Sequence, residues 1–122
     1  MSQSIRPERR SLTKEERALL EWLVANSTPD AQHYATQIAD VSVVGRCTCG
    51  CPTIDLAVRE HNQQKKSPSS IIADFVGKSP EGVDVGVILH AQEGWISELE
   101  VYAIPDVKGP FNLPSIDSLK QF

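Results

Sequence analysis

The sequence contains no apolar run long enough to cross a membrane and no apolar leader. A spanning helix needs roughly 20 consecutive apolar residues, and no stretch of this 122-residue chain approaches that length. Residues 1–13 (MSQSIRPERRSLT) are polar and basic, whereas a secretory signal carries an apolar segment. We therefore expect a cytoplasmic protein that does not bind a membrane. In that compartment thiols stay mostly reduced.

The sequence also lacks an excess of positive charge. Its 12 Lys and Arg residues against 16 Asp and Glu residues give a formal net charge of −4. Nucleic acids and anionic membranes attract basic surfaces, so this balance argues against both as partners. Electrostatic complementarity instead favours a basic protein partner. No Gly-rich phosphate loop, nucleophile elbow or paired-histidine metalloprotease motif occurs, so no catalytic residue is assigned.

The remaining composition is that of an ordinary globular protein, with 40% hydrophobic and 23% charged residues. A chain of this length can bury one core of its own. We therefore expect residues 1–122 to form a single domain. Within it, residues 1–11 are expected to be flexible, residues 13–104 to form the folded core, and residues 105–122 to form a Pro-rich C-terminal tail.

Two helices are predicted in the first third of the chain. Thr13 and Glu16 have the spacing of a capping box, in which each side chain binds the backbone amide of the other. Apolar residues follow at helical spacing: Leu19, Leu20, Leu23 and Val24. Thr28 is placed to cap a second helix, with Pro29 at its first position. The short join between the two predicts a helical hairpin.

From Val41 onwards the pattern changes to alternating apolar and polar residues, which is typical of strands. The predicted strands lie at 41–48, 53–58, 71–77, 83–89 and 95–102. Short connections favour antiparallel neighbours. The predicted fold class is α+β, with the N-terminal helical hairpin packed on one face of an antiparallel sheet of about five strands.

The only cysteines of the chain are Cys47, Cys49 and Cys51, at alternate positions directly before Pro52. Gly50 between the last two suits the tip of a tight turn. Three interpretations of the cluster remain open. The cysteines act as small residues that pack, with Cys47 facing the core; they bind a soft metal ion such as Zn²⁺ or Cu(I) as thiolates; or they form a reversible disulfide.

A structural zinc site takes a fourth ligand. The histidines of the chain are His33, His61 and His90, and His61 on the loop after the second predicted strand is the most mobile candidate. The cofactor is unknown from the sequence, and zinc is one candidate.

Polar residues gather on one face of the predicted sheet, because the alternation sends apolar side chains to the other face. This face carries Arg46, Asp55, Asp74, His90, Glu98, Glu100 and Tyr102. The residues Arg46, Asp55, His90, Glu98, Glu100 and Tyr102 are the candidate binding residues. Three interpretations stay open: a solvated face, a binding face for a partner, and a carboxylate–histidine site for acid–base chemistry.

Two segments resemble a family of small, uncharacterised bacterial proteins. The first is RCTCGCPTIDL at residues 46–56, and the second is GWISELEVY at residues 94–102. Members of the family pair a cysteine-rich strand turn of the form C-x-C-G-C-P with a later S-E-L-E-V-Y strand. Ile96 stands where leucine is more usual in the family. The resemblance covers most of residues 13–104 and implies no known activity.

Three functions are compatible with these patterns. The first hypothesis is a non-enzymatic protein-interaction or accessory domain that uses the acidic sheet face to hold a basic partner. Small acidic α+β proteins of this size are similar to the immunity proteins of bacterial toxin systems. The second is a small protein that binds a soft metal through the CxCxC cluster, and the third is a minor enzyme. No oligomeric state follows from the sequence.

Overall fold

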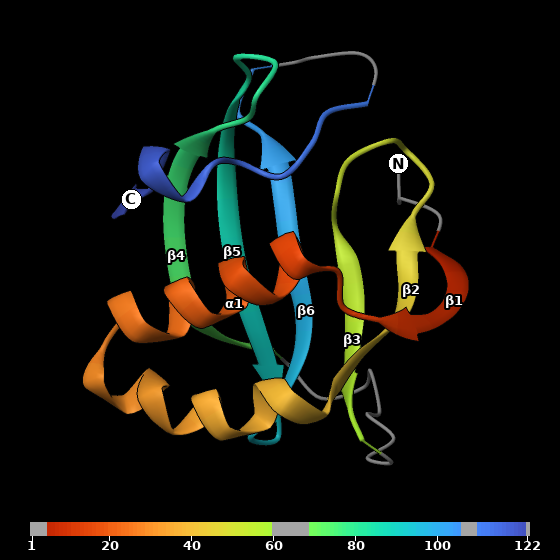
Figure 1. Cartoon of the computed structure of the whole chain (residues 1–122), viewed down its shortest axis with the longest axis vertical. Coiled ribbons are helices and arrows are strands. Elements are labelled where there is room, and N and C mark those ends of the chain that lie inside the picture. The colour runs from red at the N-terminus through yellow and green to blue at the C-terminus, as the bar shows by residue number, and fades with distance from the viewer. Residues whose placement is uncertain (1–4, 60–68, 106–109, 122) are drawn as a thin grey trace.

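In the computed structural model, which describes residues 5–59, 69–105 and 110–121, helices cover one face of an antiparallel sheet (Figure 1). Along the chain the elements are β1 (Ile5–Ser11), α1 (Lys14–Asn26), the 3-10 helix η1 (Pro29–Asp40), β2 (Val41–Cys47), β3 (Ile54–Val58), β4 (Ser70–Lys78), β5 (Asp84–Gln92), β6 (Trp95–Ala103), the 3-10 helix η2 (Ile116–Ser118) and β7 (Lys120–Gln121). The described residues thus form an α+β structure in which strands predominate.

The described strands form a seven-stranded sheet in the order β1-β2-β3-β6-β5-β4-β7, and every neighbouring pair is antiparallel. The prediction of about five strands was wrong, although β2 to β6 lie close to the predicted ranges. The two strands that were not predicted are β1 and β7, which lie at the edges of the sheet. Edge strands pair through the backbone on one side only, so their sequences need no buried alternating face.

The prediction of an N-terminal helical hairpin was also wrong. The fold begins with β1, which pairs with β2, and the segment after α1 is a 3-10 helix. Thr13 and Glu16 do form the predicted capping box at the start of α1. The predicted cap at Thr28 makes no side-chain hydrogen bond to η1. The segment that follows it has only a sparse apolar face, burying Ala31, Tyr34 and Ile38.

The core lies between the helices and the central strands. Buried leucines of α1 face the apolar positions of β5 and β6 in one continuous cluster, which includes Leu19, Leu20, Leu23, Val85, Val87, Leu89, Leu99 and Val101. These eight side chains are each no more than 1% exposed. At about 1.5–3 kcal/mol for each fully buried large apolar side chain, this layer is the main source of stability. No helix among the described residues is long and apolar enough to span a bilayer.

A bulge in β6 changes which of its side chains reach this core. His90 pairs with Glu98, but the next pair is Ala91 with Ile96, so Ser97 is the additional residue. Ile96 is therefore fully buried, with 0% exposure. Simple alternation had placed Ile96 on the same face as Glu98, and that prediction was wrong because a bulge reverses the faces beyond it.

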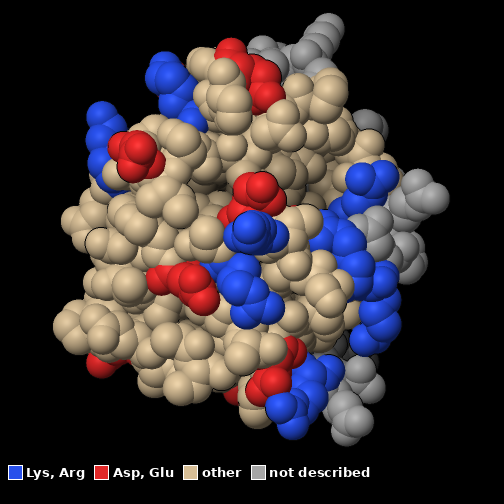
Figure 2. Space-filling model, in the orientation of Figure 1, with Lys and Arg blue, Asp and Glu red and all other residues tan. Residues whose placement is uncertain are grey.

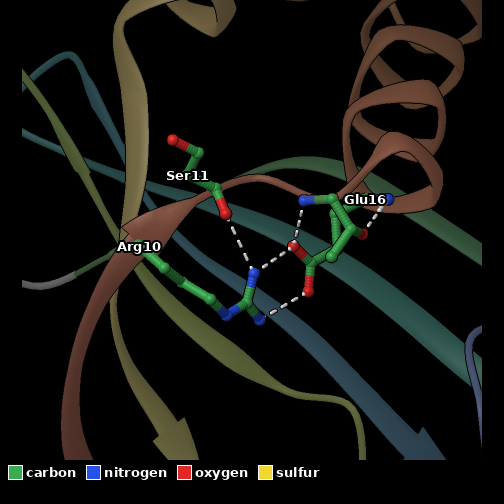
Figure 3. Close-up of polar contacts among 4 residues, drawn as sticks. Arg10, Ser11 and Glu16 are labelled. Carbon is green, nitrogen blue, oxygen red and sulfur yellow. Dashed lines mark hydrogen bonds and ion pairs between the residues drawn. The ribbon is translucent and has the colours of Figure 1, made fainter.

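Arg10 of β1 joins the edge of the sheet to the start of α1 (Figure 3). Its guanidinium donates to both carboxylate oxygens of Glu16, at 2.8 and 2.9 Å, and to the carbonyl of Ser11 at 3.0 Å. The same carboxylate accepts from the amide of Thr13 at 2.9 Å. Burial opposes ionisation of Glu16, but the hydrogen bonds from Arg10 and Thr13 outweigh it and lower the pKa of this carboxyl below its ordinary value.

The Glu16 contact generates a prediction about pH. Because the folded pKa lies below the unfolded value of about 4.5, the stability from this group is complete above that pH and is lost as the pH falls through the folded pKa. We expect Glu16→Gln to lower the free energy of unfolding by about 1–3 kcal/mol at neutral pH. The deficit should shrink as the pH falls below the unfolded pKa. Urea denaturation at a series of pH values measures both quantities.

The matched control is Glu21→Gln, since Glu21 lies exposed on the same helix. An exposed substitution should change the free energy of unfolding by no more than about 0.5 kcal/mol. A deficit for Glu16→Gln that stays constant down to acid pH would contradict the role assigned to the ionised carboxylate.

Candidate metal centre

The three cysteines lie on the turn that joins β2 to β3. Cys47 ends β2, and its amide donates to the carbonyl of Thr53 at 3.2 Å, which closes residues 48–52 into a loop. Gly50 has a φ of +101°, a conformation that residues with a side chain rarely adopt. The prediction that Gly50 supplies the turn conformation is therefore confirmed.

Two contacts hold this turn in place, and the sequence analysis anticipated neither. The hydroxyl of Thr53 donates to the carbonyl of Val101 at 3.0 Å and accepts from its amide at 2.9 Å, which fixes the start of β3 to β6. The amide of Phe111 donates to the carbonyl of Gly50 at 3.3 Å. Thr53 lies directly before β3, and a hydroxyl side chain at the start of a strand was a signal that could have been used. The Phe111 contact carries no signal in the sequence pattern.

The sulfur of Cys49 contacts the sulfurs of both neighbouring cysteines. The Sγ of Cys49 lies 2.7 Å from that of Cys47 and 2.9 Å from that of Cys51. All three sulfurs lie within 4.8 Å of one another. Cys47 is buried as predicted, Cys49 is exposed and Cys51 is intermediate. The cluster therefore extends from the core to the surface, with its central member accessible from solvent.

Burial and hydrogen bonding affect these thiols in opposite directions. Burial of Cys47, together with its contact to Cys49, raises the pKa of that thiol to about 12. Burial also disfavours the Cys49 thiolate, but the contacts to the Cys47 and Cys51 sulfurs and to the Cys51 amide outweigh it, so the pKa of Cys49 is lowered. The amides of Cys49 and Cys51 lie 3.4 Å from the preceding cysteine's sulfur. Negative charge is therefore better accommodated on the sulfur of Cys49 than on that of Cys47.

The three sulfurs are close enough together to hold one metal ion. Zinc–sulfur bonds of about 2.3 Å in a tetrahedral site place their sulfurs about 3.8 Å apart. The sulfurs of this turn would need to separate by about 1 Å from their present contacts, a movement within reach of side-chain rotation on a loop. Cysteine sulfur is also the donor that selects Cu(I) and Zn²⁺ over harder ions.

No histidine among the described residues joins this cluster. The ring of His33 contacts the carbonyl of Asp30 at 2.6 Å, on η1. His90 contacts Glu100 on β6. The remaining candidate for a fourth ligand, His61, lies outside the described residues. The described part of the chain thus supplies three sulfur ligands.

The structure brings together some of the residues that were predicted to form the polar face of the sheet. Register places Asp55 opposite Glu98 and Glu98 opposite His90, so the three form a row across β3, β6 and β5. His90 Nε2 lies 2.8 Å from a carboxylate oxygen of Glu100. Asp55 is only 7% exposed, so little of its carboxylate meets solvent.

Three further residues predicted for this face have different outcomes. Asp74 lies opposite Ile88, in the same row as Glu100. Tyr102 lies opposite Gly86, and a Cβ at Gly86 would collide with the tyrosine ring. Arg46 lies opposite Ile54 rather than Asp55, because a bulge at residue 44 shifts the register of β2. Arg46 is exposed but is not aligned with the carboxylate row.

The side of the molecule on which α1 and η1 cover the sheet carries charges of both signs at its surface (Figure 2). Lys and Arg side chains gather along the side where β1 lies in Figure 1. Arg9 and Arg46 are exposed on β1 and β2. The carboxylate row and this basic edge therefore occupy different parts of the molecule.

The chain matches no protein-family model, no curated protein and no solved structure. The resemblance carried by the two sequence motifs stays a prediction. Any function must therefore be argued from the geometry of this chain alone.

The turn geometry generates a prediction about Gly50. A Cβ at this position would lie 3.1 Å from the Cα of Pro110, so alanine meets both an unfavourable φ and the backbone of the C-terminal segment. Gly94 has a similar φ of +85° with nothing within 4 Å of its Cβ position. We expect Gly94→Ala to cost about 1–2 kcal/mol of unfolding free energy from conformation alone, and Gly50→Ala to cost more.

Urea denaturation of both variants measures the difference. Since the φ penalty is common to both, the difference reports the contact between the cysteine turn and the C-terminal segment. Equal losses in the two variants would show that a Cβ at position 50 meets no steric cost from Pro110.

Proposed function

We propose that the protein binds a soft metal ion, Zn²⁺ or Cu(I), through the thiolates of Cys47, Cys49 and Cys51. The observation that carries this proposal is the convergence of three sulfurs within 4.8 Å on one turn. Two amides of the turn also approach these sulfurs at 3.4 Å. Hydrogen bonds of this kind favour the charged form of the acceptor, which is the form that binds metal.

Packing accounts for Cys47 and in part for Cys51, which is partly buried against the core cluster, but not for Cys49. Cys47 is 4% exposed and belongs to the buried residues of the protein. Cys49 is exposed, and Cys51 is intermediate. A small apolar side chain at an exposed turn position gains little from burial, so the packing interpretation gives no reason for the central sulfur.

The described residues supply three ligands on a surface turn, which leaves one position of a tetrahedral site open among them. Structural zinc sites are usually closed by four protein ligands, whereas sites with three protein ligands leave a position for water or another molecule. The exposure of Cys49 gives an ion direct access from solvent. This arrangement supports reversible metal binding, as in an accessory protein that accepts and releases an ion, over a permanent structural role.

The metal proposal predicts the stoichiometry of binding. Protein prepared without an affinity tag, reduced and loaded with Zn²⁺ or Cu(I), should retain about one ion per chain after gel filtration. Elemental analysis measures this ratio. Cys49→Ser removes the central sulfur and should weaken binding at least about tenfold, or about 1.4 kcal/mol.

The matched control is Thr48→Ser, which alters the same turn and leaves all three sulfurs. It should bind as the wild type does. Retention of less than about a tenth of an equivalent of both ions by the wild-type protein would refute the proposal.

The second function we propose is recognition of a basic protein segment by the carboxylate face. Glu98 and Glu100 lie at alternate positions of β6, on the face opposite α1 and η1, and both are partly exposed. The side chain of Glu100 is 38% exposed although it contacts His90. Two carboxylates at this spacing, about 7 Å apart along the strand, suit the amine groups of a lysine-rich segment.

This second proposal is tested with an oligolysine peptide of defined length. The wild-type protein should bind it at low salt and lose affinity as salt is raised. The double variant Glu98→Gln/Glu100→Gln should bind more weakly. Its matched control, Glu15→Gln/Glu21→Gln, removes the same charge from exposed positions of α1. Equal binding by both double variants in isothermal titration would contradict a role for the sheet face.

A further inference from the structure

The cysteine turn has a feature that metal binding does not require. Its sulfurs touch in series, with Cys49 in contact with a neighbour on each side at 2.7 and 2.9 Å. All three are free thiols. We infer that Cys49 and Cys51 form a reversible disulfide when a hydroperoxide reaches the turn, so that the turn is a site of oxidative modification. This inference does not depend on the proposed metal binding.

Accessibility identifies Cys49 as the sulfur that meets the oxidant. It is the exposed member of the cluster, whereas Cys47 is 4% exposed. Oxidation by hydroperoxides is selective for sulfurs that solvent can reach. The neighbouring sulfur at 2.9 Å is already within reach of the oxidised product.

The backbone identifies Cys51 as the second partner. Cys47 ends β2, opposite Ile5 of β1, and its amide donates to Thr53. A disulfide to Cys47 would pull on these strand hydrogen bonds. Cys51 lies in the turn between β2 and β3, outside both strands, so closure of the Cys49–Cys51 ring leaves the sheet undisturbed.

The residues between the cysteines favour the same pair. A disulfide across one intervening residue closes a small ring, which demands unusual backbone angles. Gly50, at φ +101°, stands between Cys49 and Cys51 and has no Cβ to oppose that closure. Thr48 stands between Cys47 and Cys49, and its β-branched side chain is stiffer. The sequence Cys-Gly-Cys is therefore the easier of the two rings to close.

The chemistry balances with hydrogen peroxide as the oxidant. The Cys49 sulfur attacks one peroxide oxygen, the O–O bond breaks, and the departing hydroxide takes up the thiol proton and leaves as water. Cys49 is then a sulfenic acid. The Cys51 sulfur attacks the Cys49 sulfur, the S–O bond breaks and a second water leaves. Two thiols are oxidised by two electrons, and one peroxide is reduced to two waters.

One consequence rests on the metal proposal. The disulfide would remove two of the three sulfurs that could hold an ion, so oxidation and metal binding exclude one another. A bound ion would shield the sulfurs, and oxidation would release the ion.

The test uses the full chain with a chelator present, so that no metal takes part. After treatment with one equivalent of hydrogen peroxide, the intact mass should fall by two hydrogen atoms, and dithiothreitol should restore it. Alkylation after unfolding should then label Cys47 alone, which locates the disulfide in the wild-type protein without any substitution. An unchanged mass, a disulfide-linked dimer, or label on Cys51 would each overturn the inference.

Two variants test which cysteines form the disulfide. Cys47→Ser keeps the reacting pair and should lose two hydrogen atoms as the wild type does. Cys51→Ser should stop at the sulfenic acid, which a dimedone-type probe traps on Cys49. A disulfide formed by Cys51→Ser would assign the reaction to Cys47 and contradict the inference. Because this test contains no metal, a negative result would not count against the metal proposal. A negative result in the metal-binding test would likewise not count against the disulfide.

Discussion

The register between β3, β6 and β5 is the constraint on which the rest of the structure depends. Ile54 lies opposite Leu99 and Leu99 opposite Leu89, and all three are buried against the helices. Side chains alternate along a strand, so this pairing sends their neighbours to the opposite face. A slip of one residue would bury charged carboxylates, at several kilocalories per mole each, and would expose the core. The cost of both errors makes the register strongly specified.

The same ladder positions the cysteine turn. The hydroxyl of Thr53 takes the place of a backbone partner for Val101. It donates to the carbonyl of Val101 and accepts from its amide, so both of these buried groups are hydrogen-bonded. The tip of the turn is held separately, through the contact of Gly50 with Phe111. With its base and its tip fixed, the turn holds its three sulfurs in contact in the described structure. Preorganisation of this kind reduces the ordering cost of binding.

The sequence predicted the parts of the fold that depend on periodic burial. The strands β2 to β6 and the capping box of α1 follow from alternation and from local hydrogen bonding, which the residues themselves specify. Alternation cannot reveal a bulge, so it misplaced Ile96 and Arg46. The edge strands β1 and β7 were missed because their pairing uses the backbone, which every sequence carries. The contact of Gly50 with the C-terminal segment depends on tertiary packing between distant segments, and no local pattern encodes it.

The cysteine cluster was visible in the sequence, but its chemistry depends on a property that only the structure gives. Alternate positions on a regular strand share one face but lie about 7 Å apart along it, which would keep the sulfur of Cys49 away from its neighbours. The turn after Cys47 instead brings the sulfurs of all three cysteines together. One end of the cluster is anchored in the core at Cys47, and its centre is exposed at Cys49. An ion and an oxidant would both reach the cluster through that exposed sulfur, so the proposed metal binding and the proposed oxidation would use the same geometry and compete for it.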